Sequence, residues 1–136
     1  MLWLALGVLV GGVRDRGRGD PVSTGGLAGT VLSWSEKEFQ VQVLEAAKAT
    51  GWTLRYHTHD SRRSEPGFPD LVLVHPRHCW VLFRELKTEK GRTTAKQDEW
   101  ILGLGLAGLD AGVWRPRDWV SRRIQTELTG RQVRGA

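Results

Sequence analysis

Two short apolar runs joined by a turn constrain the fold of this chain more than any other feature. The first run, Leu71 to Val74, follows a Gly/Pro turn, and the second extends from Trp80 to Leu86. Runs of this length that are bounded by turn residues are typical of β-strands. Because the connection between them is short and contains Pro76, the two runs predict an antiparallel hairpin.

The second run carries charged residues whose directions follow from the strand period. Alternate side chains on a strand lie on one face, so Glu85 and Lys87 are neighbours, whereas Arg84 lies on the opposite face. Asp70 begins the first run, and antiparallel pairing can place it beside Glu85. The hairpin therefore predicts two carboxylates and one ammonium in contact. Arg84 is harder to bury than an apolar residue, which affects the expected packing more than the chemistry.

Paired carboxylates in this position favour a metal site. Like charges in contact are unfavourable unless a cation lies between them, and oxygen ligands suit Mg²⁺ or Mn²⁺. A lysine beside such a cation can orient or deprotonate a water molecule, or stabilise negative charge on a phosphodiester under attack. The ordinary alternative is a solvated ion pair on an exposed strand, with Pro69 and Asp70 as a common turn dipeptide.

Pro69 and Asp70, followed by Glu85, Leu86 and Lys87, resemble the PD-(D/E)XK nuclease superfamily. The surrounding segments resemble the VRR-NUC domain, the virus-type replication-repair nuclease, from about residue 33 to residue 119. They are S-E-K-E-F-Q, H-T-H-D-S-R-R-S-E-P-G-F-P-D-L-V-L-V, E-L-K and G-R-T-T-A-K-Q-D-E-W, in the order of the family. The resemblance implies an α/β fold with a restriction-endonuclease-like core, in the order α-β-β-β-α-β, whose central mixed sheet is flanked by helices.

The resemblance also implies a metal-dependent DNA endonuclease that leaves 5′-phosphate and 3′-hydroxyl ends. Asp70, Glu85 and the backbone carbonyl of Leu86 would hold Mg²⁺ or Mn²⁺. Lys87 would position the water nucleophile, and Gln97, which matches the glutamine after E-x-K in the family, would steady Lys87 or a phosphate. Small stand-alone members resemble Holliday-junction resolvases and often act as homodimers. Branched DNA and a homodimer are therefore expected, with a helicase or replication protein as a further candidate partner.

A third acidic residue is expected on the first helix of the domain, predicted over residues 36–50. Ser35 and Glu38 fit the S-x-x-E capping box, which gives Glu38 a structural role. Glu36 has no such explanation beyond a favourable charge near a helix N-terminus. In the resemblance, Glu36 and Gln40 match a family pattern, E-x-x-(apolar)-Q. We therefore predict that Glu36 joins the metal site, with Glu38 as the alternative.

The charge of the chain favours a polyanionic partner. The formal net charge is +5 and the sequence pI is about 10.0, and cations that neutralise phosphates release condensed counterions. Basic residues flank the predicted site on both sides, and we expect these to bind DNA: Arg62, Arg63, Lys90, Arg92 and Lys96. His57, His59 and Asp60 are interpreted as substrate contacts rather than as a zinc site, because further nitrogen or sulfur ligands are missing. The alternative function is a non-catalytic nucleic-acid-binding module of the same fold.

The chain divides by composition into three parts. Residues 1–32 are predicted to be a flexible extension, from an upstream translation start or a docking segment. Residues 33–120 form the nuclease domain, and residues 121–136 form a basic tail that extends a short helix and frays. The apolar stretch from Leu2 to Val10 is shorter than the ~20 residues that span a bilayer. The single cysteine, Cys79, excludes an internal disulfide and favours a reducing, intracellular setting. The resemblance implies the cytoplasm of a bacterial or phage-infected cell.

The remaining segments complete the expected core. Residues 52–58 alternate as a half-buried strand, Thr93 or Thr94 caps a helix that contains Gln97, and residues 111–114 form the last strand. Cys79 is expected in the core. Three tryptophans are expected to pack in the core: Trp52, Trp80 and Trp114. Two others are candidate surface contacts: Trp100 and Trp119.

Overall fold

The computed structural model describes residues 24–58 and 62–130. The elements follow one another as α2 (Thr24–Leu32), α3 (Glu36–Ala49), β1 (Leu54–His57), β2 (Leu71–His75), the 3-10 turn η1 (Pro76–His78), β3 (Trp80–Leu86), α4 (Ala95–Leu106), β4 (Asp110–Trp114), α5 (Pro116–Val120) and α6 (Arg123–Thr129). The predicted order α-β-β-β-α-β is present from α3 to β4. None of the helices in these residues is long and apolar enough to cross a membrane.

The four strands form one mixed sheet in the order β1-β2-β3-β4. The strands β1, β2 and β3 pair in an antiparallel manner, whereas β4 runs parallel to β3 after the crossover through α4. The predicted hairpin is confirmed, and its register pairs Leu71 with Arg84. That register places Asp70, the residue before β2, at the level of Glu85 on β3.

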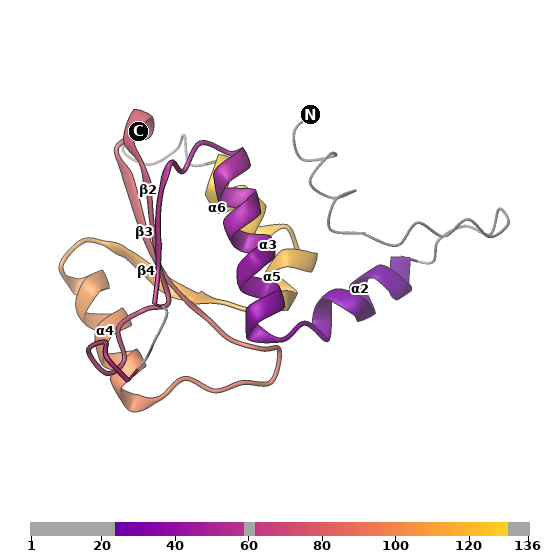
Figure 1. The fold of residues 1–136 in the computed structure, drawn as a ribbon, viewed down its shortest axis with the longest axis horizontal. Helices are drawn as coiled ribbons and strands as arrows, with labels where there is room; N and C mark the ends of the chain where they lie inside the picture. The colour runs from indigo at the N-terminus through magenta and orange to yellow at the C-terminus, as the bar shows by residue number, and fades with distance from the viewer. Residues whose placement is uncertain (1–23, 59–61, 131–136) are drawn as a thin grey trace, which may run out of the picture.

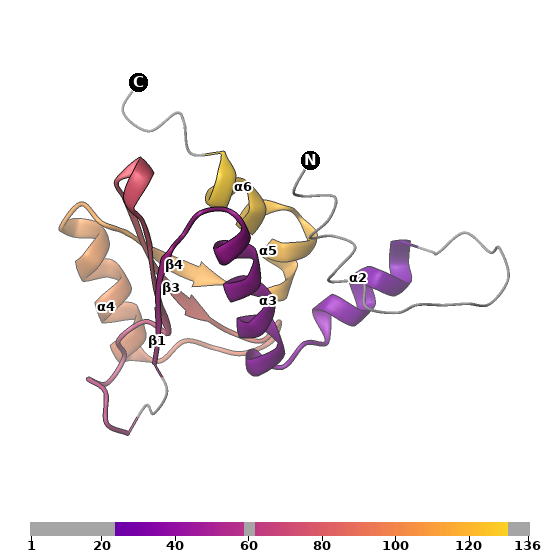
Figure 2. The same cartoon turned by 45° about the horizontal axis from the view of Figure 1, so that its top comes forward.

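Helices cover the two faces of the sheet unequally (Figure 1, Figure 2). The helices α3, α5 and α6 lie on one face and α4 lies on the other. Most of the core lies on the first face, where the fully buried residues include Trp52, Trp114, Leu82, Phe39 and Ile124. By contrast, no residue of α4 is buried. The fold is thus an α/β fold with a four-stranded mixed sheet flanked by helices, as predicted from the sequence.

Both ends of the domain differ from the sequence prediction. Residues 24–32, expected to be flexible, form α2, which packs against α5 and places Val31 in the core. The residues from Ser121 onward, expected to fray, include α6, whose Ile124 and Leu128 are buried. These apolar side chains order the segments because they bury surface against the main core. Residues 1–23, with the stretch Leu2 to Val10, and residues 131–136 lie outside the described part.

Three predictions about burial were wrong. The strand β1 is an edge strand with mostly exposed side chains, and Leu54 and Tyr56 are 60% and 55% exposed. Cys79 is exposed, because it ends η1 in a left-handed conformation with φ of 55°. Trp119 is buried and packs edge-on against Trp34, with ring centroids 5.6 Å apart. The predicted core positions of Trp52 and Trp114 are confirmed, and Trp80 is partly buried and packs against the core.

Candidate active site

Asp70 lies where the three antiparallel strands end together. The backbone N–H of Leu86 donates to Asp70 Oδ2 at 2.9 Å, and the N–H of Thr58 donates to the Asp70 carbonyl at 2.9 Å. The side chain of Asp70 therefore takes the place of a ladder acceptor at the end of β3. These bonds fix the carboxylate at the junction of the segments that follow β1 and precede β2.

Glu85 is a buried carboxylate with an incomplete set of partners. Only 2% of the residue is exposed. Its Oε1 accepts from Gln97 Nε2 at 2.7 Å and lies 3.2 Å from Lys87 Nζ, whereas its Oε2 is buried without a hydrogen-bond partner. The pKa of Glu85 is raised to about 7, chiefly by burial and then by the negative charge of Asp70, while Lys87 partly offsets the rise. The two predicted carboxylates and the lysine are therefore brought together.

Gln97 serves two structural partners at once. Its Oε1 accepts from the backbone N–H of Thr94 at 2.8 Å, which completes a capping box at the start of α4, and its Nε2 donates to Glu85. The cap fixes the direction of the amide, because Oε1 is held by the backbone. The N-terminus of α4 thereby sets the position of the Glu85 carboxylate. Sequence reasoning placed Gln97 at the site but did not foresee its second bond.

Helix α3 carries both candidate glutamates, Glu36 and Glu38, and they have different partners. Ser35 and Glu38 form the predicted capping box, with the N–H of Ser35 donating to Glu38 Oε2 at 2.8 Å. Glu36 instead approaches the site, where its Oε1 lies 4.0 Å from Lys87 Nζ, and its side chain is 55% exposed. In residues 24–58 and 62–130, no three or more His, Cys, Asp or Glu residues are grouped as a metal site. The structure thus places Glu36 beside Lys87, and its role as a metal ligand remains a prediction.

The oxygen ligands that this cluster supplies suit a divalent cation. Asp70 and Glu85 supply carboxylate oxygens, which are preferred ligands of hard cations. A cation between them would provide a partner for the orphaned Oε2 of Glu85 and would offset the repulsion between the two carboxylates. Buried polar atoms in native proteins nearly always have a partner, so an exception of this kind needs an explanation. A cation supplies one.

The predicted DNA-binding residues are all exposed, and they lie on the loop before β2, on the loop after β3 and at the start of α4: Arg62, Arg63, Lys90, Arg92 and Lys96. Lys96 pairs with Glu99 at 3.2 Å, one turn along α4. His57 was also predicted to contact the substrate. Its Nδ1 lies 3.2 Å from Nε2 of Gln40 on α3. His59 and Asp60 lie outside the described residues.

A clamp on the loop after Lys87 was missed by sequence reasoning. Arg115 Nη1 donates to the carbonyls of Thr88, at 2.9 Å, and of Gly91. Arg117 Nε donates to Glu89 Oε1 at 2.7 Å. Both arginines flank Pro116 at the end of β4, which is the strand that pairs with β3. The clamp therefore holds the loop that carries Lys90, and no local pattern links residues so far apart in the sequence.

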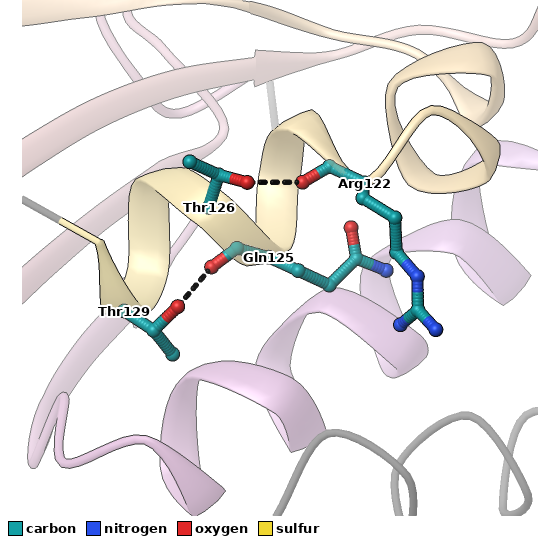
Figure 3. Close-up of a pocket in the computed structure, with 4 residues that line it drawn as sticks. All are labelled: Arg122, Gln125, Thr126 and Thr129. Carbon is teal, nitrogen blue, oxygen red and sulfur yellow. Dashed lines mark hydrogen bonds between the residues drawn. The ribbon is translucent and has the colours of Figure 1, made fainter.

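A cavity of about 230 Å³ on α6 is separate from this cluster (Figure 3). Two of its threonine hydroxyls are used within the helix, since Thr126 donates to the carbonyl of Arg122 at 2.9 Å and Thr129 to that of Gln125 at 2.7 Å. Gln125 Oε1 is buried without a hydrogen-bond partner, and burial removes it from contact with solvent in the cavity. None of the residues that line this cavity belongs to the carboxylate cluster.

A mixed sheet with Asp70, Glu85 and Lys87 at the end of its hairpin is the core and the motif of a PD-(D/E)XK nuclease. The family model of the VRR-NUC domain matches residues 21–118, and the chain belongs to this family. No curated protein and no solved structure matches the chain. Membership of this family identifies the protein as a nuclease, which is a hydrolase that acts on DNA. Nucleases of the PD-(D/E)XK type generally use divalent metals.

Proposed function

We propose that this protein is an endonuclease that hydrolyses DNA phosphodiester bonds with Mg²⁺ or Mn²⁺ and acts on branched DNA. The observation that carries the proposal is the buried carboxylate of Glu85, which has one oxygen without a partner and lies beside Lys87. Arg84 and Gln125 also have one buried atom without a partner, but Glu85 differs from them because its orphaned oxygen belongs to a carboxylate that lies beside a second carboxylate, that of Asp70. The Glu85 oxygen that has no partner supports a site that is completed by a cation.

The chemistry follows from how the side chains are held. Asp70 and Glu85, with the Leu86 carbonyl, would hold the cation, and Glu36 would extend this set. When bound, a divalent cation stabilises negative charge on the phosphodiester and makes an attacking water molecule more acidic. Lys87, whose side chain is 12% exposed, keeps its ammonium beside Glu85 and can donate to the attacking water or to a phosphate oxygen. Gln97 holds the Glu85 carboxylate in position through its bond to Oε1.

Cleavage of a junction by paired cuts would require two active sites, and we propose a homodimer. Exposed apolar side chains support a protein partner: on α4, Leu102 and Leu106 are 64% and 81% exposed. Apolar residues exposed to this degree on one helix face are typical of interaction surfaces. We place the activity in the cytoplasm of a bacterial or phage-infected cell, where the single cysteine, Cys79, would remain reduced.

The test is cleavage of labelled four-way junction, flap, splayed and linear duplex DNA with Mg²⁺, Mn²⁺ or EDTA. Asp70→Asn and Lys87→Ala should abolish cleavage, whereas Glu45→Gln, a change at an exposed position of α3, should not. Paired cuts at the junction that need a metal would support all parts of the proposal. If every substrate is bound but none is cut with either metal, the protein is instead a nucleic-acid-binding module of this fold.

A further inference from the structure

A second cavity, of about 420 Å³, lies along α4, the helix that carries Gln97. It is lined by residues of α4 and of its C-cap, and they are Glu99, Trp100, Gly103, Leu104 and Ala107. The proposed reaction uses none of them.

The indole of Trp100 is fixed in place at the edge of this cavity. Its Nε1 donates to the carbonyl of Pro66 at 3.2 Å. The ring packs edge-on against Phe68, with ring centroids 5.2 Å apart and an interplanar angle of 84°. Gly67, between those two residues, is closely packed on α4, because a Cβ atom there would lie 2.4 Å from the carbonyl carbon of Lys96. Trp100 is therefore anchored to the loop that leads into Asp70.

The helix that lines the cavity, and the loop to which Trp100 is bonded, both also reach the candidate active site. Gln97, which donates to Glu85, lies one turn before Trp100 on α4. Exposed cations lie on the same two segments, with Arg62 and Arg63 on the loop and Lys96 on the helix. Phosphates bound at these cations would therefore lie on the same loop and the same helix that hold Trp100.

The chemistry of the lining suits a flat aromatic ring with polar edges. An indole face stacks on any nucleobase, and Gly103 and Ala107 leave room for a ring to approach the helix. Glu99 has a side chain that is 71% exposed at the rim; its Oε2 accepts from Lys96 Nζ, and its other carboxylate oxygen can accept from an exocyclic amino group. A base that is paired within a duplex cannot present its face to such a cavity.

We propose that this cavity binds an unpaired nucleobase of the DNA substrate, stacked on Trp100. The inference rests on the proposed nuclease function and identifies how the site would select branched or frayed DNA. Duplex segments would be held through their phosphates alone. An unpaired nucleotide near the cut would add a stacking contact, which is worth about tenfold in affinity or more.

The test fills the cavity without disturbing the fold. Gly103→Leu adds a side chain where an added Cβ meets no atom within 4 Å, so the backbone has room for it. Replacing a glycine inside a helix also raises helix propensity. Gly105→Leu is the matched control, because Gly105 is equally open but does not line the cavity. Gly105 lies beside Leu102 and Leu106 on α4, so the oligomeric state of both variants is measured as well. Binding of splayed and fully paired DNA is measured for both variants with Ca²⁺, together with cleavage in Mg²⁺.

We expect Gly103→Leu to weaken binding of splayed DNA by about tenfold and to leave binding of paired duplex unchanged. Gly105→Leu should change neither. In the wild type, 2-aminopurine at the unpaired position should be quenched on binding, and Gly103→Leu should remove the quenching. Equal effects of the two variants, equal losses on both DNAs, or a change of oligomeric state confined to Gly103→Leu would overturn the inference. If wild type cuts no DNA, the nuclease proposal fails separately, because the binding readouts do not depend on cleavage.

Discussion

Two neighbouring residues on β3, Arg84 and Glu85, carry buried charges whose surroundings differ. Arg84 is 1% exposed and faces α6, whereas Glu85 is 2% exposed and faces α4. Arg84 donates to Asp110 Oδ1 at 2.7 Å and lies 3.3 Å from Glu127 Oε1, and its guanidinium lies 5.0 Å from the centre of the Trp114 ring. Of its nitrogens, only Nε lacks a partner.

The two clusters differ in whether the protein itself completes the charge balance. Asp110 and Glu127 both approach Arg84, and Glu127 Oε2 also accepts from Trp114 Nε1 at 2.6 Å. Around Glu85, Asp70 adds a second negative charge and Oε2 has no partner. A buried cation that lies between two carboxylates of the protein holds a fold together, whereas a buried carboxylate beside a second carboxylate is suited to bind a cation.

The sharpest test of this comparison is Glu85→Gln. The variant keeps the size of the side chain but removes a cation ligand, so the rate of DNA cleavage should fall by about 10³-fold or more. Its melting temperature should stay the same or rise, because a buried charge with a raised pKa is lost. Cleavage assays and thermal unfolding are run on the same preparation. A variant that unfolds at lower temperature would indicate that Glu85 is structural like Arg84.

Arg84→Met should give the opposite result. Removing the arginine leaves Asp110 and Glu127 without their cation, and breaking a buried pair in this way costs about 3–5 kcal/mol. Chemical denaturation measures the free energy of unfolding. Residual cleavage per folded molecule should be close to that of wild type. Adding Asp110→Asn and Glu127→Gln to the variant should recover part of the loss, and a failure to recover any would contradict an electrostatic cause.

Gln97→Ala and Thr94→Ala separate the two bonds of the amide. Both variants remove the capping box of α4, at a cost of about 1 kcal/mol in stability. Only Gln97→Ala also removes the donor to Glu85, so it alone should reduce cleavage further, by about 10- to 100-fold. Steady-state kinetics and unfolding are compared for the pair. Equal kinetics in the two variants would mean that Gln97 acts through the helix cap alone.

The smallest expected effect is on the pH dependence of stability without metal. Because the pKa of Glu85 rises from 4.5 to about 7 on folding, the folded state binds more protons between these values. Stability from this group is therefore lost as pH rises from about 4.5 to about 7. Burial, followed by the charge of His78, lowers the pKa of His75, so its contribution has the opposite sign and is lost as pH falls below 6.5.

The contribution of Glu85 is isolated by comparing unfolding of wild type and Glu85→Gln across this range in EDTA. The difference between them should change with pH, and saturating Mg²⁺ should abolish the downward trend of the wild type, because the cation favours the ionised carboxylate. A difference that is constant with pH would mean that Glu85 keeps an ordinary pKa.

The sequence predicted what depends on local periodicity. The hairpin and the approach of Asp70 to Glu85 follow from strand alternation and a short turn, and the capping box of Ser35 and Glu38 follows from residues three apart. The cluster of Arg84 could not be predicted in this way, because Asp110 and Glu127 lie 26 and 43 residues away. Only the closed fold brings them to the guanidinium.

The misses on burial have a related cause. Leu54 alternates like a half-buried strand residue, but α4 packs on β4 rather than on β1, so its face of the edge strand stays open. The segment of α2 has few sequence signals for a helix, and it is ordered by packing on α5. The Arg115 clamp on Thr88 likewise depends on the pairing of β3 with β4. These features belong to tertiary packing.

The bond from the Leu86 N–H to Asp70 makes strand register a condition of activity. Asp70 occupies the last position of the hairpin ladder, directly opposite the strand that carries Glu85 and Lys87. A slip of one residue would turn the side chains of β3 to the opposite face and send Glu85 into the helical core. A chain that paired its strands wrongly would thus be inert toward DNA. DNA cleavage would therefore serve as a readout of correct strand pairing in this hairpin.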